Sequence, residues 1–170
     1  MRHFGLSAAL SLALPLSGAI AQPAPAPSAR APAMPLEYAA KFVCTRGEVD
    51  TPTSSFAVGA YYTAVNIHNP SRLGVLTYKV ALAPLAAPGP ITAFRPTVEL
   101  KYDQAFEVDC RVIAAMLAAS GIIVPPVYSG FLVIQSRTEL DVVAVYTAAP
   151  APGKPVTAIH TERVPVRRVM

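Results

Sequence analysis

Tryptophan is absent from the 170-residue chain, charged residues make up only 14%, and cysteine occurs twice. Apolar residues account for 53% of the sequence, which is enough to build a packed core and excludes disorder over the whole chain. The net charge is only +4, and lysine and arginine come close together only at Arg163, Arg167 and Arg168, whereas nucleic-acid binders gather them on one face. We therefore expect a single domain with no nucleic-acid partner.

The sequence also lacks the motifs that carry most enzyme chemistry. It has no GxSxG nucleophile turn, no glycine loop before a Lys-Ser or Lys-Thr pair, and no HxH, HExxH or CxxC spacing. After export only His68 and His160 would remain as histidines, and Glu107 with Asp109 comes nearest to a carboxylate pair. We expect no catalytic residue, no cofactor and no metal ion, and hence a protein that is not an enzyme.

The first 21 residues have the pattern of a secretory signal peptide. Arg2 precedes the apolar run Phe4–Leu16, and small residues follow up to Ala21. An uncleaved membrane anchor is the alternative, but a proline and a glycine interrupt a stretch that barely reaches the roughly 20 residues of a span. We expect cleavage before Gln22, a periplasmic or secreted protein, and no stable membrane insertion after signal cleavage.

Residues 22–35, QPAPAPSARAPAMP, form a segment rich in proline and alanine. Proline fixes the backbone and lacks an N–H, so the segment is expected to be an extended linker. An exposed export tail explains the same composition equally well. The folded domain is expected to begin at Leu36 and to cover residues 36–170.

From Leu36 onward, short runs of β-branched and aromatic residues alternate with turn-forming residues, which predicts strands. In residues 60–68 the alternation places Val65 and Ile67 on one face and Asn66 and His68 on the other. About seven strands of this kind predict an immunoglobulin-like antiparallel β-sandwich. The expected strands are Tyr38–Arg46, Ala60–His68, Leu73–Ala83, Val98–Val108, Gly130–Ser136, Leu140–Ala148 and Val156–Val164.

One segment predicts a short α-helix, residues 109–121. Asp109 can accept the free N–H groups of a first helical turn, and Gly121 suits the left-handed conformation that ends a helix. The apolar residues recur at spacings of three and four and are expected to line one buried face. They are Val112, Ile113, Met116 and Leu117.

Two connections can also be predicted. The apolar runs on either side of residues 136–139 are expected to form a hairpin of two central strands. The proline-rich segment Leu85–Pro96 cannot supply sheet donors at its prolines and is expected to be a loop across the end of the sandwich.

The two cysteines, Cys44 and Cys110, both follow the export signal, and disulfides persist in exported proteins. We expect a disulfide between them, which would stabilise the fold by about 4 kcal/mol on the chain-entropy model. The alternative is two free thiols, with Cys110 made reactive by its place at a helix N-terminus.

The best polar cluster in the sequence lies around the end of the second expected strand. Asn66, His68 and Asn69, with Tyr62, form a candidate binding patch whose aromatic ring could stack on a sugar. A histidine that simply braces the Asn69-Pro70-Ser71 turn explains the same residues.

The runs Tyr62–Ser71 (YTAVNIHNPS) and Gly130–Thr147 (GFLVIQSRTELDVVAVYT) resemble those of a group of uncharacterised small bacterial β-sandwich proteins. Over about residues 58–148 the chain is also similar to the sensory rhodopsin transducer family, which has a comparable strand with an Asn-containing turn and a late hairpin. This chain differs in its signal peptide and proline-rich linker. The resemblance implies a β-sandwich, oligomer formation through sheet surfaces, and no catalytic residues.

Together these features predict an exported, non-catalytic binding or assembly module with a protein partner or a homo-oligomeric state. A small-ligand or carbohydrate-binding sensor is the alternative.

Overall fold

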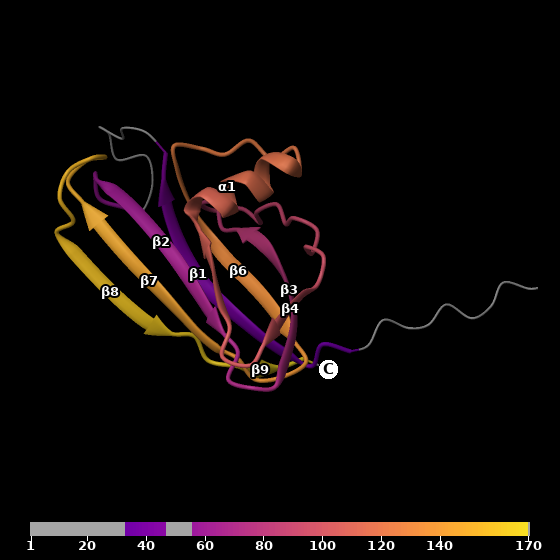
Figure 1. Cartoon of the computed structure of the whole chain (residues 1–170). Coiled ribbons are helices and arrows are strands. Elements are labelled where there is room, and N and C mark those ends of the chain that lie inside the picture. The colour runs from indigo at the N-terminus through magenta and orange to yellow at the C-terminus, as the bar shows by residue number, and fades with distance from the viewer. Residues whose placement is uncertain (1–32, 47–55, 170) are drawn as a thin grey trace, which may run out of the picture. The chain divides into compact units, whose positions relative to one another are not determined.

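Two antiparallel β-sheets and one helix make up residues 33–46 and 56–169, the part of the chain that the computed structural model describes (Figure 1). The all-β sandwich predicted from the sequence is confirmed. The five-stranded sheet has the order β4 (Val98–Lys101), β3 (Leu73–Leu82), β6 (Val127–Ser136), β1 (Leu36–Thr45) and β9 (Arg167–Arg168). The four-stranded sheet has the order β5 (Ala105–Asp109), β2 (Ala60–His68), β7 (Asp141–Ala149) and β8 (Ala158–Arg163).

The core lies between the inner faces of the two sheets. In β2, Val65 and Ile67 are fully buried while Asn66 and His68 are partly exposed, so the predicted alternation is confirmed. Branched aliphatic side chains fill the interior together with a few aromatic rings. The largest fully buried side chains are Tyr38, Phe42, Val65, Ile67, Leu76, Val80, Val108, Ile113, Leu117, Leu132, Ile134 and Val142.

The predicted helix is present as α1 (Cys110–Ala119). The Asp109 side chain accepts hydrogen bonds of 2.9 Å from the backbone N–H groups of Arg111 and Val112, as expected of an N-cap. Gly121 has a φ of 71° and follows the end of the helix. Ile113, with Met116 and Leu117, is buried, but Val112 is 37% exposed and does not belong to the predicted buried face.

The strand expected over Val98–Val108 is in fact two strands in different sheets. Asp103, in the turn between them, has a φ of 61°, which a continuous strand cannot contain. Its backbone N–H donates to the Asn69 carbonyl over 2.9 Å. The chain therefore turns from β4 in one sheet to β5 in the other, and Leu100 and Val108 enter the core from opposite sides.

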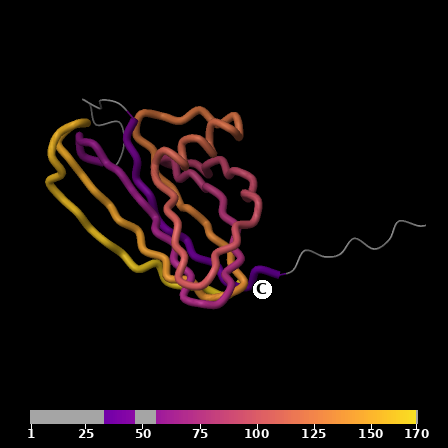
Figure 2. The backbone as a smooth tube through the Cα atoms, in the orientation of Figure 1, coloured from indigo at the N-terminus to yellow at the C-terminus, as the bar shows by residue number. Residues whose placement is uncertain are grey.

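The predicted hairpin around residues 136–139 is wrong, although both of its strands are central. β6 pairs with β1 and β3, and β7 pairs with β2 and β8, so the two strands have no free edge for each other. Figure 2 follows the backbone from one sheet to the other. Continuous apolar runs in the sequence indicate that both strands are central, but they do not indicate which strands pair with each of them.

The loop Leu85–Pro96 lies along the edge of β3 rather than across the end of the sandwich. The Thr92 N–H donates to the Val80 carbonyl over 2.9 Å, and the Arg95 N–H donates to the Tyr78 carbonyl over 2.8 Å. The non-proline residues of the loop therefore satisfy part of the β3 edge, even though the prolines cannot donate.

The predicted signal peptide, residues 1–21, lies outside the described residues, as does all of the predicted linker except residues 33–35. Near the C-terminus, the expected strand Val156–Val164 is the shorter β8, and the two-residue strand β9 follows it. Within the described residues, no helix is both long and apolar enough to cross a membrane.

Neighbouring helix residues offer a test of this packing. Ile113→Ala should lower the free energy of unfolding by about 2–5 kcal/mol because it leaves a cavity in the core. Val112→Ala should cost less than about 1 kcal/mol because Val112 is partly exposed. Denaturant unfolding of both variants measures the difference, and equal losses would contradict the described orientation of α1.

Candidate functional site

The predicted polar patch is divided between the two ends of β2. Tyr62, Asn66 and His68 share the outward face of the four-stranded sheet, because residues two apart in a strand point the same way. Tyr62 and His68 are six residues apart, so about 20 Å of strand separates them. Asn69 is fully buried. The structure therefore does not bring the four residues together in one site.

Asn69 holds the turn after β2. Its side-chain amide donates to the carbonyls of Ser71 and Leu100, each over 2.8 Å, and to the carbonyl of Lys101 over 3.0 Å. Gly74 lies directly against this amide, and a Cβ at that position would come within 2.8 Å of the Asn69 Cγ. Since its donors are used within the protein, Asn69 has a structural role.

His68 lies between two carboxylates. Its Nε2 is 2.9 Å from an oxygen of Asp103, and its Nδ1 is 3.3 Å from an oxygen of Asp141. The hydrogen bonds with Asp103 and then Asp141 raise the pKa of His68 above its usual 6.5. The other Asp141 oxygen accepts from Arg163 over 2.8 Å. His68 thus joins the β4–β5 turn to the start of β7, rather than bracing the Asn69-Pro70-Ser71 turn.

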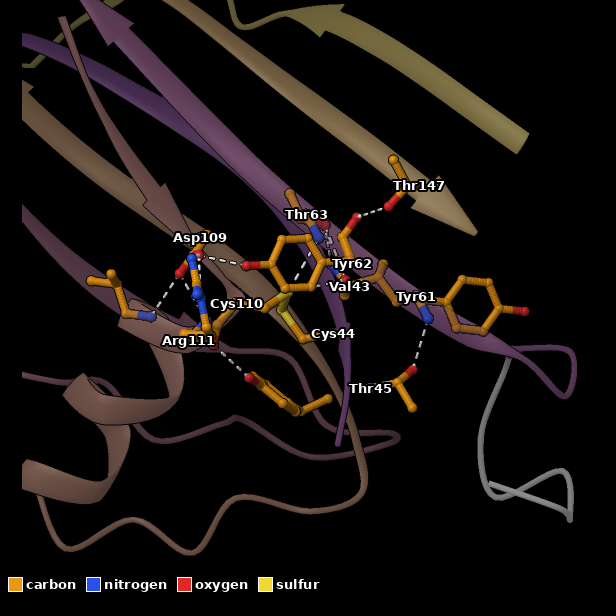
Figure 3. The surroundings of a disulfide bond; sticks show 12 residues. Val43, Cys44, Thr45, Tyr61, Tyr62, Thr63, Asp109, Cys110, Arg111 and Thr147 are labelled. Atoms are coloured by element: carbon orange, nitrogen blue, oxygen red, sulfur yellow. Dashed lines mark hydrogen bonds and ion pairs between the residues drawn. A yellow bond between two sulfur atoms is a disulfide. The ribbon is translucent and has the colours of Figure 1, made fainter. Parts of the chain in front are cut away.

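Cys44 and Cys110 form the predicted disulfide, which joins β1 to the start of α1 (Figure 3). Their Cα atoms are 5.7 Å apart, and both residues are buried. The backbone N–H of Thr63 donates to the Cys110 sulfur over 3.2 Å. The disulfide therefore fixes one end of the sandwich, and Cys110 is not a free thiol in this structure.

Tyr62 belongs to a small polar cluster beside this disulfide. Its hydroxyl donates to the Asp109 carboxylate, which also forms an ion pair of 2.8 Å with Arg111 (Figure 3). Burial alone would raise the pKa of Asp109, but hydrogen bonds from Tyr62, the Val112 N–H and Arg111 lower it to about 2. Because Asp109 caps α1 and both of its carboxylate oxygens accept hydrogen bonds, this cluster supports the start of the helix.

A small apolar cleft lies between β1 and the strands β2, β7 and β8. Its volume is about 240 Å³, and nearly all of its surface is apolar. Several polar groups around it have partners within the protein: the Thr63 hydroxyl bonds both the N–H and the carbonyl of Val43, and the Tyr61 hydroxyl donates to the Ala57 carbonyl. The lining residues are Val43, Tyr61, Tyr62, Thr63, Tyr146, Thr147, Ala148, Ala158, Ile159 and His160.

The edge strand β8 is the longest fully exposed strand of the described residues. All six of its residues, Ala158–Arg163, are exposed, and it lies at the outer side of β7 with no further strand beyond it in the described part of the chain (Figure 1). Ile159 is 69% exposed. The other terminal strands are shorter, with four, five and two residues in β4, β5 and β9. An exposed edge of this kind is a template for another strand.

The sequence predicts the strand that becomes β8 and singles out Tyr62, which lines the cleft, but it identifies neither the exposed edge of β8 nor the cleft as a site. A usable signal existed: Pro155 and Pro165 enclose a run that alternates Ile159, Thr161 and Arg163 with other residues, which is typical of an edge strand. The alternation of arginine and valine over residues 163–169 also predicts an edge strand, but Arg163 ends β8 in one sheet and Arg167 lies in β9 of the other. Among the described residues, no three His, Cys, Asp or Glu side chains gather as metal ligands would.

The environment of His68 predicts a pH-dependent stability. A pKa that is raised on folding gives stabilisation that is fully present below the unfolded value near 6.5 and is lost as the pH rises through the folded value. His68→Gln should therefore destabilise the protein more at pH 5 than at pH 9. Unfolding of both proteins at the two pH values measures this, and a loss that is equal or larger at pH 9 would contradict the interpretation.

No protein-family model and no curated protein matches the sequence. Among solved structures, the chain is similar to the crystal structure of Thermotoga maritima 1070, with a TM-score of 0.46 and 10% sequence identity. The similarity covers 76% of this chain and 91% of that chain.

Proposed function

We propose that the chain is an exported, non-catalytic β-sandwich module that binds a protein partner or its own copies through the edge strand β8. The observation that carries the proposal is the full exposure of all six residues of β8. Strand addition to a sheet edge gives affinity through backbone hydrogen bonds, while side chains on alternate positions give specificity. No catalytic chemistry is needed for this function.

Export is supported by two independent features. The first 21 residues have the pattern of a signal peptide, and Cys44 forms a buried disulfide with Cys110. Disulfides persist in the periplasm and outside the cell, and are rare in the reducing cytosol. We therefore place the module in the periplasm or outside the cell.

A small-ligand sensor is the second candidate, because the apolar cleft between β1 and the strands β2, β7 and β8 has space for a small ring. Three tyrosines line it, namely Tyr61, Tyr62 and Tyr146, and His160 stacks on Tyr146 with ring centroids 6.0 Å apart. Sugars need several hydrogen-bonding groups, and those near this cleft are largely engaged within the protein. The cleft therefore suits an apolar ring better than a carbohydrate.

Blocking the outer edge of β8 tests the first candidate. Thr161→Pro removes a backbone N–H from the middle of the edge, whereas Thr161→Val keeps it and serves as the matched control. We expect the protein purified under native conditions to sediment as an assembly or complex, Thr161→Val to do the same, and Thr161→Pro to sediment as a monomer with an unchanged far-ultraviolet spectrum. A native chain that is strictly monomeric and has no co-purifying partner would contradict the proposal.

Filling the cleft tests the second candidate. Small apolar ring compounds should raise the Tm of the native protein, and Ala148→Leu should abolish the shift by occupying the cleft. Ala64→Leu, on the outward face of the same sheet, is the matched control and should leave the shift intact. If no compound raises the Tm, and a glycan array also gives no signal, the ligand-sensor candidate is removed.

A further inference from the structure

We infer that one end of the sandwich attaches to an anionic phospholipid membrane surface through three apolar turns and the basic residues beside them. The turns are residues 83–90, 120–126 and 150–157, which together form the apolar end. The inference does not depend on the β8 edge, and it adds a lipid surface to the binding partners of the proposed module. The contact is with the headgroup layer of the membrane and does not require a segment that spans it.

The strand registers bring the three turns to the same end of the molecule. The first turn follows β3, the second joins α1 to β6, and the third joins β7 to β8 (Figure 1). Thr45, the last residue of β1, lies opposite Val127 at the start of β6, and its hydroxyl accepts the Tyr61 N–H at the start of β2 over 3.0 Å. The Leu82 N–H donates to the Pro90 carbonyl over 3.0 Å, so the first turn closes before the chain runs back along the edge of β3. Both sheets therefore contribute turns to this end.

Each of the three turns exposes a large apolar side chain. Ile123 is 92% exposed, Leu85 is 78% exposed and Val156 is 53% exposed. The first two turns contain no charged residue, and the third contains only Lys154. Ala86, next to Leu85, has a φ of 58°, a conformation that residues with a Cβ rarely adopt and that recurs at ligand-binding sites. The apolar end thus presents separate apolar tips with little charge among them.

The charged side chains that are exposed beside these tips are basic. The Arg46 N–H donates to the Pro126 carbonyl over 2.7 Å, which places Arg46 next to the second turn, and Lys154 lies within the third. Among the described residues, the acidic residue at this end is Asp109, which is buried and forms an ion pair with Arg111. The charge of the apolar end is therefore complementary to a surface of anionic phospholipids, which attracts lysine and arginine.

A lipid surface suits the apolar end better than a folded protein does. Three side chains that project from separate turns would each need a matching hollow in a protein partner, because protein interfaces are packed as closely as protein interiors. The boundary between headgroups and acyl chains accepts isolated apolar side chains, while the lipid phosphates attract the basic ones. At the opposite end of the sandwich, acidic and basic residues are mixed, as with Asp103 and the Arg137–Glu139 turn.

A single tryptophan tests the contact directly, because the chain contains none. The protein expressed from its full coding sequence with Ile123→Trp is mixed with vesicles of equal parts phosphatidylcholine and phosphatidylglycerol. Its emission should shift to the blue and should be quenched by brominated acyl chains, because the ring enters the membrane interface. Tyr102→Trp, at the opposite end and 66% exposed before substitution, is the matched control and should show neither effect. Equal effects at both positions, or no effect at either, would contradict the inference.

Polar substitutions measure the apolar and the electrostatic contributions separately. Ile123→Ser should weaken binding to these vesicles about 10- to 100-fold, because the contact of an isoleucine side chain with lipid is lost. Lys154→Gln should weaken binding about 5-fold, and only on vesicles that contain phosphatidylglycerol. Leu73→Ser and Arg72→Gln, at the opposite end, are the matched controls and should bind like the native chain. Cosedimentation with vesicles measures all five proteins, and far-ultraviolet spectra establish that the variants are folded.

The outcomes separate a lipid surface from other partners. Vesicle binding that Ile123→Ser weakens and the two controls retain supports the inference. Vesicle binding that Ile123→Ser leaves intact comes from another part of the chain and overturns it, as does a native chain that binds neither kind of vesicle. If no vesicle binds and Ile123→Ser instead disrupts a native complex, the apolar end contacts a protein, and the inference is wrong. None of these results decides whether the β8 edge binds a partner.

Discussion

Backbone hydrogen bonding at the sheet edges is the constraint on which this structure depends. Every strand at an edge has N–H and carbonyl groups without a strand partner, and buried groups of this kind must find another one. β9 pairs with only two residues of β1, and side chains supply partners for backbone groups farther along that strand. The Thr63 hydroxyl bonds both the N–H and the carbonyl of Val43, and the Tyr146 hydroxyl bonds the Lys41 carbonyl. The edge of β3 is satisfied by β4 and by the backbone of the proline-rich loop. The pairing of β2 with β5 does not reach Thr63, and the Thr63 N–H donates instead to the Cys110 sulfur of the disulfide.

Among the terminal strands of the described residues, β8 is the longest, and all six of its residues are exposed. Both side chains on its inner face, His160 and Glu162, contact Tyr146, and this contact orders the strand without covering its outer edge. Water satisfies an exposed edge in a monomer, so β8 carries no penalty in isolation. Its charged residues, Glu162 and Arg163, act against indiscriminate pairing with other exposed edges.

The sequence was informative wherever a local rule applied. Alternation in β2 predicted the buried face of Val65 and Ile67, capping predicted the helix after Asp109, and export chemistry predicted the Cys44–Cys110 disulfide. It failed where the partner of a segment was needed, as in the division of residues 98–108 between two sheets and in the false hairpin. The polar patch failed for a related reason: Asn69 is a good hydrogen-bonding residue in any turn, and only the fold shows that Leu100 and Lys101 use its donors. The strand β8 was predicted, but its place at the edge of the sheet was not, because that place depends on strand order.

The central claim is that the outer edge of β8 is occupied when the protein is assembled. Amide hydrogen exchange measures this directly, because exchange at an exposed edge is fast and exchange within a ladder is slow. In protein purified under native conditions, the account predicts slow exchange at the N–H groups of Thr161 and Arg163, with fast exchange restored by dilution. Fast exchange at both amides at every concentration, with slow exchange at the core strands, would contradict it.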